Sequence, residues 1–179
     1  MQENFDLIKG CQKGDRKAQE ALYKDYYRAM ATICMRYMRN EEDAVEVLNN
    51  GFLKVFKNID RYDATKGALY TWIRTIVVNS CLDFIRSKHG SENHAELTDA
   101  TEAHIPAEAV SQMKTNELLQ LVRRLAPATQ AVFNLYVIEG YNHKEIGQLL
   151  GISDGTSKWH LSAARKTLQQ MLKTMNIHG

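Results

Sequence analysis

The sequence predicts an all-α protein: two small helical domains joined by an acidic flexible linker, with a helix-turn-helix in the second domain. Two observations favour helices, because the 179 residues include only two Pro and ten Gly and apolar residues recur at helical spacing. The distribution of charge along the chain distinguishes the two predicted domains from the linker between them. Residues 89–113 contain no Lys or Arg and carry a net charge of −5, between residues 1–88 at +3 and residues 114–179 at +4.

Residues 1–88 are expected to form four helices, the first over residues 4–13. Asp15 can cap the second, which extends to about Met38. The acidic residues 41–43 favour the start of the third, which contains Gly51 at a cost of about 1 kcal/mol relative to Ala. The fourth covers residues 68–88. The predicted apolar faces are Leu22, Tyr26, Ala29, Ile33 and Tyr37 on the second helix, Val45, Leu48, Phe52, Val55 and Ile59 on the third, and Leu69, Trp72, Ile73, Ile76, Val77 and Phe84 on the fourth.

Residues 114–179 are also expected to form four helices, after the linker 89–113. Pro127 suits the start of the second of these. Asn142 can cap the short third helix, Gly151 can end it, and Ser153 can cap the long fourth helix. The predicted apolar residues are, in helix order, Leu118, Leu121, Val122 and Leu125; Val132, Phe133, Tyr136 and Val137; Ile146, Leu149 and Leu150; and Leu161, Ala164, Leu168 and Leu172.

A short helix, a glycine-led turn and a longer basic helix are typical of a helix-turn-helix, whose second helix lies in the major groove of DNA. The residues expected to reach base edges are Asp154, Thr156, Ser157, Lys158 and His160, and those expected to neutralise phosphates are Lys158, Arg165, Lys166 and Lys173. If His160 contacts DNA, its protonation should raise affinity as pH falls. The alternative is an ordinary basic surface helix.

Other kinds of site find little support. Cys11, Cys34 and Cys81 are far apart in sequence and are expected to be buried free thiols. A zinc site at Cys81, His89 and His94 lacks a C-x-x-C pair, and no P-loop or H-E-x-x-H motif occurs, so we expect no metal, no cofactor and no enzymatic activity. No apolar run has the roughly 18 residues that a membrane span needs, and no signal-peptide core is present. We therefore expect a cytoplasmic protein without membrane insertion.

Motifs in both domains resemble those of the extracytoplasmic-function sigma factors of bacterial RNA polymerase. The second domain has the family's pattern at Pro127, Glu139–Gly140, Glu145–Ile146–Gly147 and Gly155–Thr156. The first domain has Glu42–Asp43–Ala44 entering its third helix, Trp72–Ile73–x–x–Ile76, and Asn79–x–x–x–Asp83–x–x–Arg86 in its fourth. Two matching domains in the right order are more specific than a helix-turn-helix alone.

The resemblance implies three binding surfaces and three partners: core RNA polymerase, promoter DNA and an anti-sigma factor. The third helix would dock on the polymerase through Asp43, Glu46, Asn49, Asn50 and Lys54. The fourth helix and the loop before it would recognise and open the −10 element. Tyr62 and Tyr70 would stack on or frame a base, and Arg74, Thr75, Asn79 and Arg86 belong to a polar stripe that also contains Thr71 and Asp83. The helix-turn-helix would read the −35 element.

The sequence departs from the family's pattern in both domains. Asn49–Asn50 replaces the family's usual Gln-Glu, which removes a carboxylate and its charge-assisted bond. The family's basic helix often carries two further arginines, where this chain has His160 and Ala163. Two alternatives therefore stay open: a stand-alone helix-turn-helix regulator, and a degenerate sigma factor that sequesters an anti-sigma factor.

Overall fold

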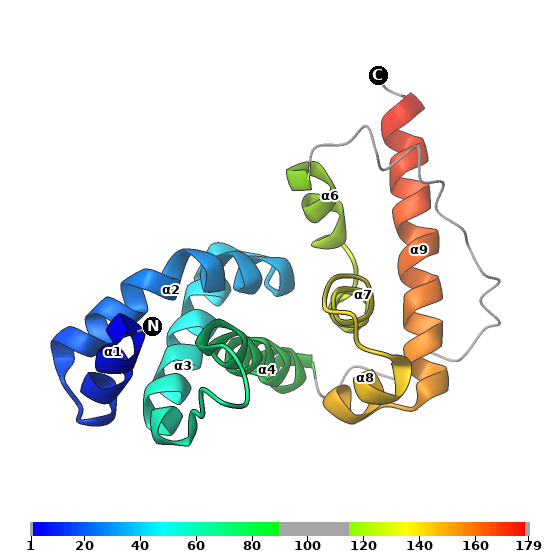
Figure 1. The fold of residues 1–179 in the computed structure, drawn as a ribbon. Helices are drawn as coiled ribbons and strands as arrows, with labels where there is room; N and C mark the ends of the chain where they lie inside the picture. The colour runs from blue at the N-terminus through cyan, green and yellow to red at the C-terminus, as the bar shows by residue number, and fades with distance from the viewer. Residues whose placement is uncertain (1, 90–114, 178–179) are drawn as a thin grey trace. The chain divides into compact units, whose positions relative to one another are not determined.

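The computed structural model describes residues 2–89 and 115–177, and every regular element in these ranges is helical (Figure 1). The chain divides into two compact units, Met1–Phe84 and Ile85–Gly179, so the boundary falls within helix α4 (Leu69–His89). The all-α, two-domain prediction is confirmed. The predicted linker, residues 89–113, lies outside the described residues except for its first position.

The four helices predicted for residues 1–88 are all present: α1 (Gln2–Gln12), α2 (Arg16–Tyr37), α3 (Glu41–Asn58) and α4, with a 3₁₀ turn, η1 (Ile59–Arg61), after α3. The predicted cap of α2 is confirmed, because Asp15 accepts from the amide nitrogen of Lys17 at 2.8 Å. Asn40 caps α3 by accepting from the amide nitrogen of Asp43 at 2.7 Å. Helices α2 and α3 pack against each other.

The core of the first unit follows the predicted faces with one clear error. Leu22, Ile33, Leu48 and Phe52 are buried as expected. Val45 was wrongly assigned to the core, since 41% of it is exposed. The buried arc of α3 is shifted to meet both α2 and α4, so it runs through Ala44, Val47, Leu48, Gly51, Phe52 and Val55. On α4, Val78, Cys81 and Leu82 join Leu69, Ile73 and Val77 in the core, while Trp72, Ile76 and Phe84 are half-buried.

Gly51 lies where α3 packs closely against α4. A Cβ atom added there would lie 3.1 Å from Val77 Cγ2 and 3.5 Å from Val77 Cα. A larger residue would require the Val77 side chain to shift by a few tenths of an ångström. This contact gives a physical reason for a glycine inside a helix, where glycine is otherwise unfavourable.

The cysteines are free and buried, as predicted. Cys34 Sγ and Cys81 Sγ lie 3.9 Å apart, one on α2 and one on α4. The hydrogen bond to Cys34 and burial raise the pKa of the Cys81 thiol well above its ordinary value. Among the described residues no group of three or more His, Cys, Asp and Glu could hold a metal ion; His94 and the side chain of His89 lie outside them.

The second unit contains α6 (Thr115–Val122), α7 (Pro127–Phe133), a π-helical turn η2 (Asn134–Ile138), α8 (His143–Leu150) and α9 (Asp154–Ile177). The predicted caps of the helix-turn-helix are confirmed. Asn142 and Glu145 form a reciprocal capping box at the start of α8. Gly151 ends α8 with φ of 69°, a left-handed conformation that glycine adopts without strain. Ser153 Oγ accepts from the amide nitrogen of Thr156 at 3.0 Å, at the start of α9.

The π-helical turn overturns one part of the predicted core. Tyr136 and Val137 were expected inside, but they are 36% and 51% exposed. The amide nitrogen of Glu139 donates to the carbonyl of Asn134 at 3.0 Å, which adds a residue to the helical turn and rotates the following side chains. Leu135 is fully buried in their place. The predicted core face of α9 is confirmed at Leu161, Ala164, Leu168 and Leu172.

Within the described ranges, no helix has both the length and the apolar character needed to cross a membrane.

Gly147→Ala is expected to destabilise the second unit by about 1–3 kcal/mol. The new Cβ would lie 2.7 Å from the backbone carbonyl oxygen of Ile152, and this clash exceeds the gain in helix propensity of at most about 1 kcal/mol. Urea unfolding of the full chain, followed by Trp159 fluorescence in a Trp72→Phe background, measures the change. Gly155→Ala is the matched control, because its Cβ would make an ordinary 3.7 Å contact with Ser153 Oγ. If the Gly147→Ala protein were as stable as this control, the proposed clash between residue 147 and the carbonyl oxygen of Ile152 would be contradicted.

Candidate nucleic-acid interface

Helix α4 presents a continuous polar surface. Thr71, Thr75, Asn79 and Arg86 are exposed and Arg74 is half-buried, so the predicted stripe reaches the surface along its whole length. Thr75 Oγ1 donates to the carbonyl of Thr71 at 2.9 Å, which leaves its oxygen lone pairs to accept. Guanidinium, amide and hydroxyl groups in one row can neutralise phosphates and bond to the edges of bases.

An aromatic cluster, made of Tyr26, Tyr62, Tyr70 and Trp72, lies at the start of α4. Tyr62 donates its hydroxyl to the carbonyl of Gly67 at 3.1 Å, and its ring centre lies 5.5 Å from that of Trp72. Tyr70 is 44% exposed, and its ring centre lies 6.4 Å from that of Tyr26. Of the predicted pair, Tyr70 is exposed, whereas Tyr62 is half-buried with its ring held by the loop. Exposed rings of this kind can stack on unpaired bases.

Tyr26 is a member of the cluster that the sequence did not reveal. Its helical spacing predicted a core position, whereas the structure leaves it half-buried beside Tyr70. Burial raises the pKa of the Tyr26 hydroxyl, and the neighbouring Asp25 and Tyr62 raise it further. Periodicity could not have shown this, since a half-buried position has the same spacing as a core position.

The exposed face of α3 contains Glu46, Asn49 and Asn50, with Asp43 partly exposed beside them. Asn49 Oδ1 accepts from the Tyr23 hydroxyl at 3.1 Å. The sequence analysis missed Leu53, which lies among these residues and is 57% exposed. A sequence signal existed: Phe52 and Leu53 are adjacent, and a helix that buries one large residue turns its neighbour through about 100°.

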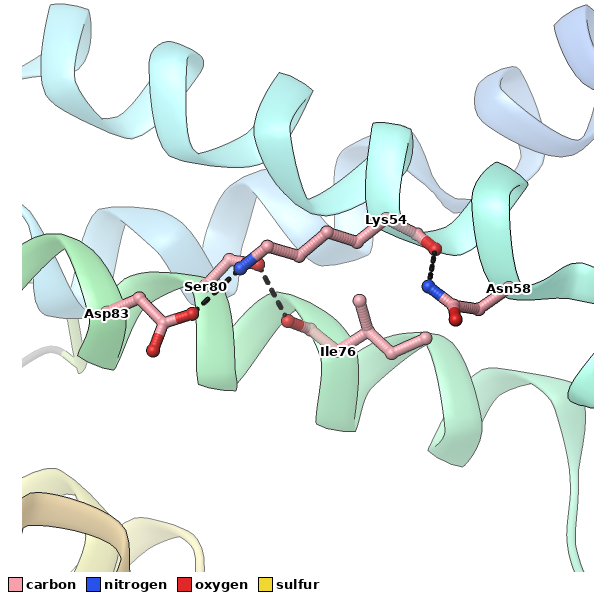
Figure 2. A network of polar contacts seen from close by, with 5 residues as sticks. All are labelled: Lys54, Asn58, Ile76, Ser80 and Asp83. Atoms are coloured by element: carbon pink, nitrogen blue, oxygen red, sulfur yellow. Dashed lines mark hydrogen bonds and ion pairs between the residues drawn. The ribbon is translucent and has the colours of Figure 1, made fainter.

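Lys54 does not lie free on this face. Lys54 Nζ is 2.8 Å from Asp83 Oδ2 on α4 (Figure 2). The residue expected to contact the polymerase is therefore engaged with the helix expected to contact DNA.

The helix-turn-helix exposes only part of its predicted DNA-binding set. Asp154, Lys158 and Lys166 are exposed, and Thr156, His160 and Arg165 are half-buried. The assignment of Ser157 to a base contact was wrong, because Ser157 is fully buried. It shares the core face of α9 with Leu161 and Ala164, at positions i+4 and i+7. Its hydroxyl oxygen lies 2.9 Å from His143 Nδ1.

His160 is held inside the second unit. Its Nδ1 lies 3.0 Å from Thr129 Oγ1 on α7, and its ring meets Trp159 edge-on at 4.9 Å. Burial lowers the pKa of His160. Protonation of His160 would oppose this packing. A fall in pH is therefore expected to disfavour this arrangement, which is the opposite of the rise in DNA affinity expected if His160 contacted a phosphate.

His143 makes the equivalent connection from α8 to α9, which no pattern in the sequence had indicated. Its ring stacks on Tyr136 with centres 4.6 Å apart, and its Nδ1 meets Ser157. Burial lowers the pKa of His143; Lys158 also lowers it and Asp154 acts in the opposite direction. The two histidines thus fasten the start of α9 to both α7 and α8.

The surface of α9 opposite its core face contains further candidates for contact with DNA besides Lys166. Gly155, Trp159, Ser162 and Lys166 follow one another at helical spacing, about 180° from Ser157, Leu161, Ala164 and Leu168. Trp159 and Ser162 are half-buried. They became candidates only when the buried face of the helix was known.

The chain matches known proteins in both units. Residues 22–90 match the family Sigma-70 region 2, and residues 115–168 match Sigma-70, region 4. The chain is 28% identical to the ECF RNA polymerase sigma factor SigM of Mycobacterium tuberculosis (strain Erdman), over 97% of this chain and 86% of that protein. It is 26% identical to the ECF RNA polymerase sigma factor SigW of Bacillus subtilis, over 94% and 96% respectively. Its fold resembles that of the sigma factor RpoE of Bartonella quintana, solved with the anti-sigma factor NepR (TM-score 0.53, 17% identity, 86% of this chain and 96% of that one).

The stability of the second unit is expected to fall as pH decreases from about 7.5 to about 5. Both histidines have folded pKa values below their ordinary value. The fold therefore favours the neutral rings, and the stability they contribute is present above the unfolded pKa and is lost as pH falls through the folded pKa. Urea unfolding midpoints across this range, in the Trp72→Phe background, measure the effect.

The double variant His143→Gln, His160→Gln is the control for this pH dependence. It should lose roughly 1 kcal/mol per hydrogen bond at pH 7.5 and show a flatter profile. An unchanged profile in the double variant would contradict the role given to the two rings.

Proposed function

The chain belongs to the extracytoplasmic-function sigma factors of bacterial RNA polymerase, and from this membership we propose how its surfaces direct promoter recognition and transcription initiation. The observation that carries the proposal is the presence, in one chain and in this order, of a region 2 match containing the α4 stripe and a region 4 match containing the helix-turn-helix. The protein performs no covalent chemistry of its own, and it acts by binding.

The exposed face of α3 binds core RNA polymerase. Leu53 supplies an apolar centre, and Asp43, Glu46, Asn49 and Asn50 supply a polar rim. Protein interfaces commonly have this composition, in which the centre excludes water and the rim determines orientation. Asn50 in place of the family's usual carboxylate leaves one charge-assisted contact to be made by other residues.

The α4 stripe and the aromatic cluster hold one strand of the −10 element open. Arg74 and Arg86 neutralise phosphates, and Thr75 and Asn79 bond to base edges. Tyr70, which is the more exposed ring, stacks on an unpaired base, while Tyr62 borders its position. Binding to exposed bases favours the open form of the promoter, because duplex DNA does not offer those contacts.

The second domain binds the −35 element as duplex DNA. The outward surface of α9 enters the major groove with Trp159, Ser162 and Lys166, and Lys158 and Arg165 lie beside it at the phosphates. Asp154 and Thr156 stand at the start of the helix, where base edges are reached. His143 and His160 hold the helix in place from within.

We also propose an anti-sigma factor as a partner and the cytoplasm as the site of action. The similar fold of the Bartonella quintana protein was solved with an anti-sigma factor. An exposed apolar residue in a polar rim, as at Leu53, can be covered by an inhibitory protein as well as by polymerase. Core polymerase and promoter DNA, the other partners, are found together in the cytoplasm of bacteria.

Run-off transcription with purified core polymerase on fragmented genomic DNA tests the function. Wild type should initiate at defined starts. Arg74→Ala and Asn79→Ala should reduce permanganate reactivity at −10 and leave duplex binding at −35 intact, and Lys158→Ala should do the reverse. Duplex binding without initiation would support a stand-alone regulator. Neither activity would support a decoy, and equal losses in all variants would contradict the division between the domains.

Leu53→Ala is expected to weaken binding to core polymerase at least about fivefold, the effect of losing roughly 1 kcal/mol from the centre of an interface. Asn50→Glu should tighten binding. Thermal stability should change little, because both side chains are exposed. Anisotropy titration of labelled protein with core polymerase measures the affinities. Val45→Ala, at another exposed apolar position of α3, is the control, and an equal loss in it would contradict a docking face centred on Leu53.

A further inference from the structure

One ion pair joins the helix proposed to bind polymerase to the helix proposed to bind DNA. Lys54 extends from α3 across to α4, and its Nζ lies 2.8 Å from Asp83 Oδ2 (Figure 2). The Lys54 and Asp83 side chains are 45% and 48% exposed. Beside the pair, Asn58 donates to the carbonyl of Lys54, and Ser80 donates to the carbonyl of Ile76, each at about 3 Å within its own helix. The ion pair is therefore a connection between the two helices.

The pair is not needed to hold the two helices together. Gly51 and Val77 already bring α3 and α4 into close contact through buried atoms. Half-exposed ion pairs add little to stability, because water screens the attraction and two long side chains lose freedom. The more consequential property of the pair is the charge that it leaves on the surface of α4.

Asp83 lies in the polar stripe of α4, four residues after Asn79 and three before Arg86. A carboxylate there repels the phosphates of an approaching strand and competes with them for Arg86, one helical turn away. Lys54 brings a positive charge to Asp83 from a different helix. It thereby reduces both effects without adding a residue to the stripe.

We propose that Lys54 is a positioning residue for promoter opening, which neutralises Asp83 so that α4 accepts the anionic strand. This reassigns Lys54 from the polymerase-docking face to which the sequence analysis assigned it. The inference rests on the proposed function of α4 in binding the −10 strand. It adds to that function a dependence of strand binding on a residue of the docking helix.

Four proteins that differ in the net charge of the Lys54–Asp83 pair test the proposal. Wild type has a neutral pair, Lys54→Met leaves −1, Asp83→Asn leaves +1, and the double variant is neutral again. The affinity of the reconstituted holoenzyme for a labelled single-stranded −10 oligonucleotide should follow this charge. Lys54→Met should bind about three- to fivefold more weakly than wild type, Asp83→Asn more tightly, and the double variant within about twofold of wild type.

The salt dependence of binding and the conservative variant Lys54→Arg provide two further tests. The differences among the four proteins should shrink as salt is raised, because they arise from charge. Lys54→Arg should retain wild-type affinity, since it keeps the charge. Lys57→Met is the matched control, because it removes one charge from an exposed position on the same helix; its effect should simply add to that of Asp83→Asn.

Three results would overturn the proposal. Equal weakening in Lys54→Met and the double variant would mean that Lys54 itself contacts DNA or polymerase. Weaker strand binding by Asp83→Asn would mean that the carboxylate makes a needed contact. Reduced affinity of Lys54→Met for core polymerase alone would restore the docking assignment. Failure of wild-type holoenzyme to bind the oligonucleotide would instead refute the proposed function of α4, and this inference with it.

Discussion

The close packing of α3 against α4 at Gly51 and Val77 is the constraint on which the first unit depends. A Cβ added at Gly51 would lie 3.1 Å from Val77 Cγ2, so a larger residue there would require Val77 to shift by a few tenths of an ångström. Because of this approach, side chains on one helix reach the other, as Lys54 reaches Asp83. Two helices with different proposed partners are consequently joined by both a buried contact and a surface ion pair.

In the second unit the equivalent constraint is polar. Hydrophobic residues along α9 bury it against its neighbours, but apolar contacts are not directional and leave its rotation loosely determined. The pairs His143–Ser157 and His160–Thr129 have directional geometry and lie on different neighbouring helices. They therefore help to fix which residues of α9 face outward, and the lowered pKa values of the two rings mean that this arrangement favours their neutral forms.

These arrangements suit the binding function proposed for the chain. A melted promoter strand is stabilised only if amides, guanidinium groups and rings are already in place, since ordering them on binding would reduce affinity. The hydrogen bond from Tyr62 to Gly67 and the packing of Trp72 against Tyr62 order the aromatic cluster in advance. The ion pair at Asp83 similarly sets the local charge before a strand arrives.

The helices, their caps, the helix-turn-helix and the family could all be predicted from the amino-acid sequence. Local signals control these features: Asp15, Asn142 and Gly151 act within a few residues of their own position, and the motifs are contiguous. Which side chains are available at the surface became known only from the packing of the helices. Val45 and Val137 have the spacing of core residues, yet they are exposed, because a neighbouring helix shifts the buried arc of α3 and a π-helical turn rotates η2. Ser157 and Lys54 are polar residue types that often contact DNA or protein partners. Ser157 is nevertheless buried against His143, and Lys54 is paired with Asp83. Such partners lie far apart in the chain, and no spacing within a single helix can reveal them.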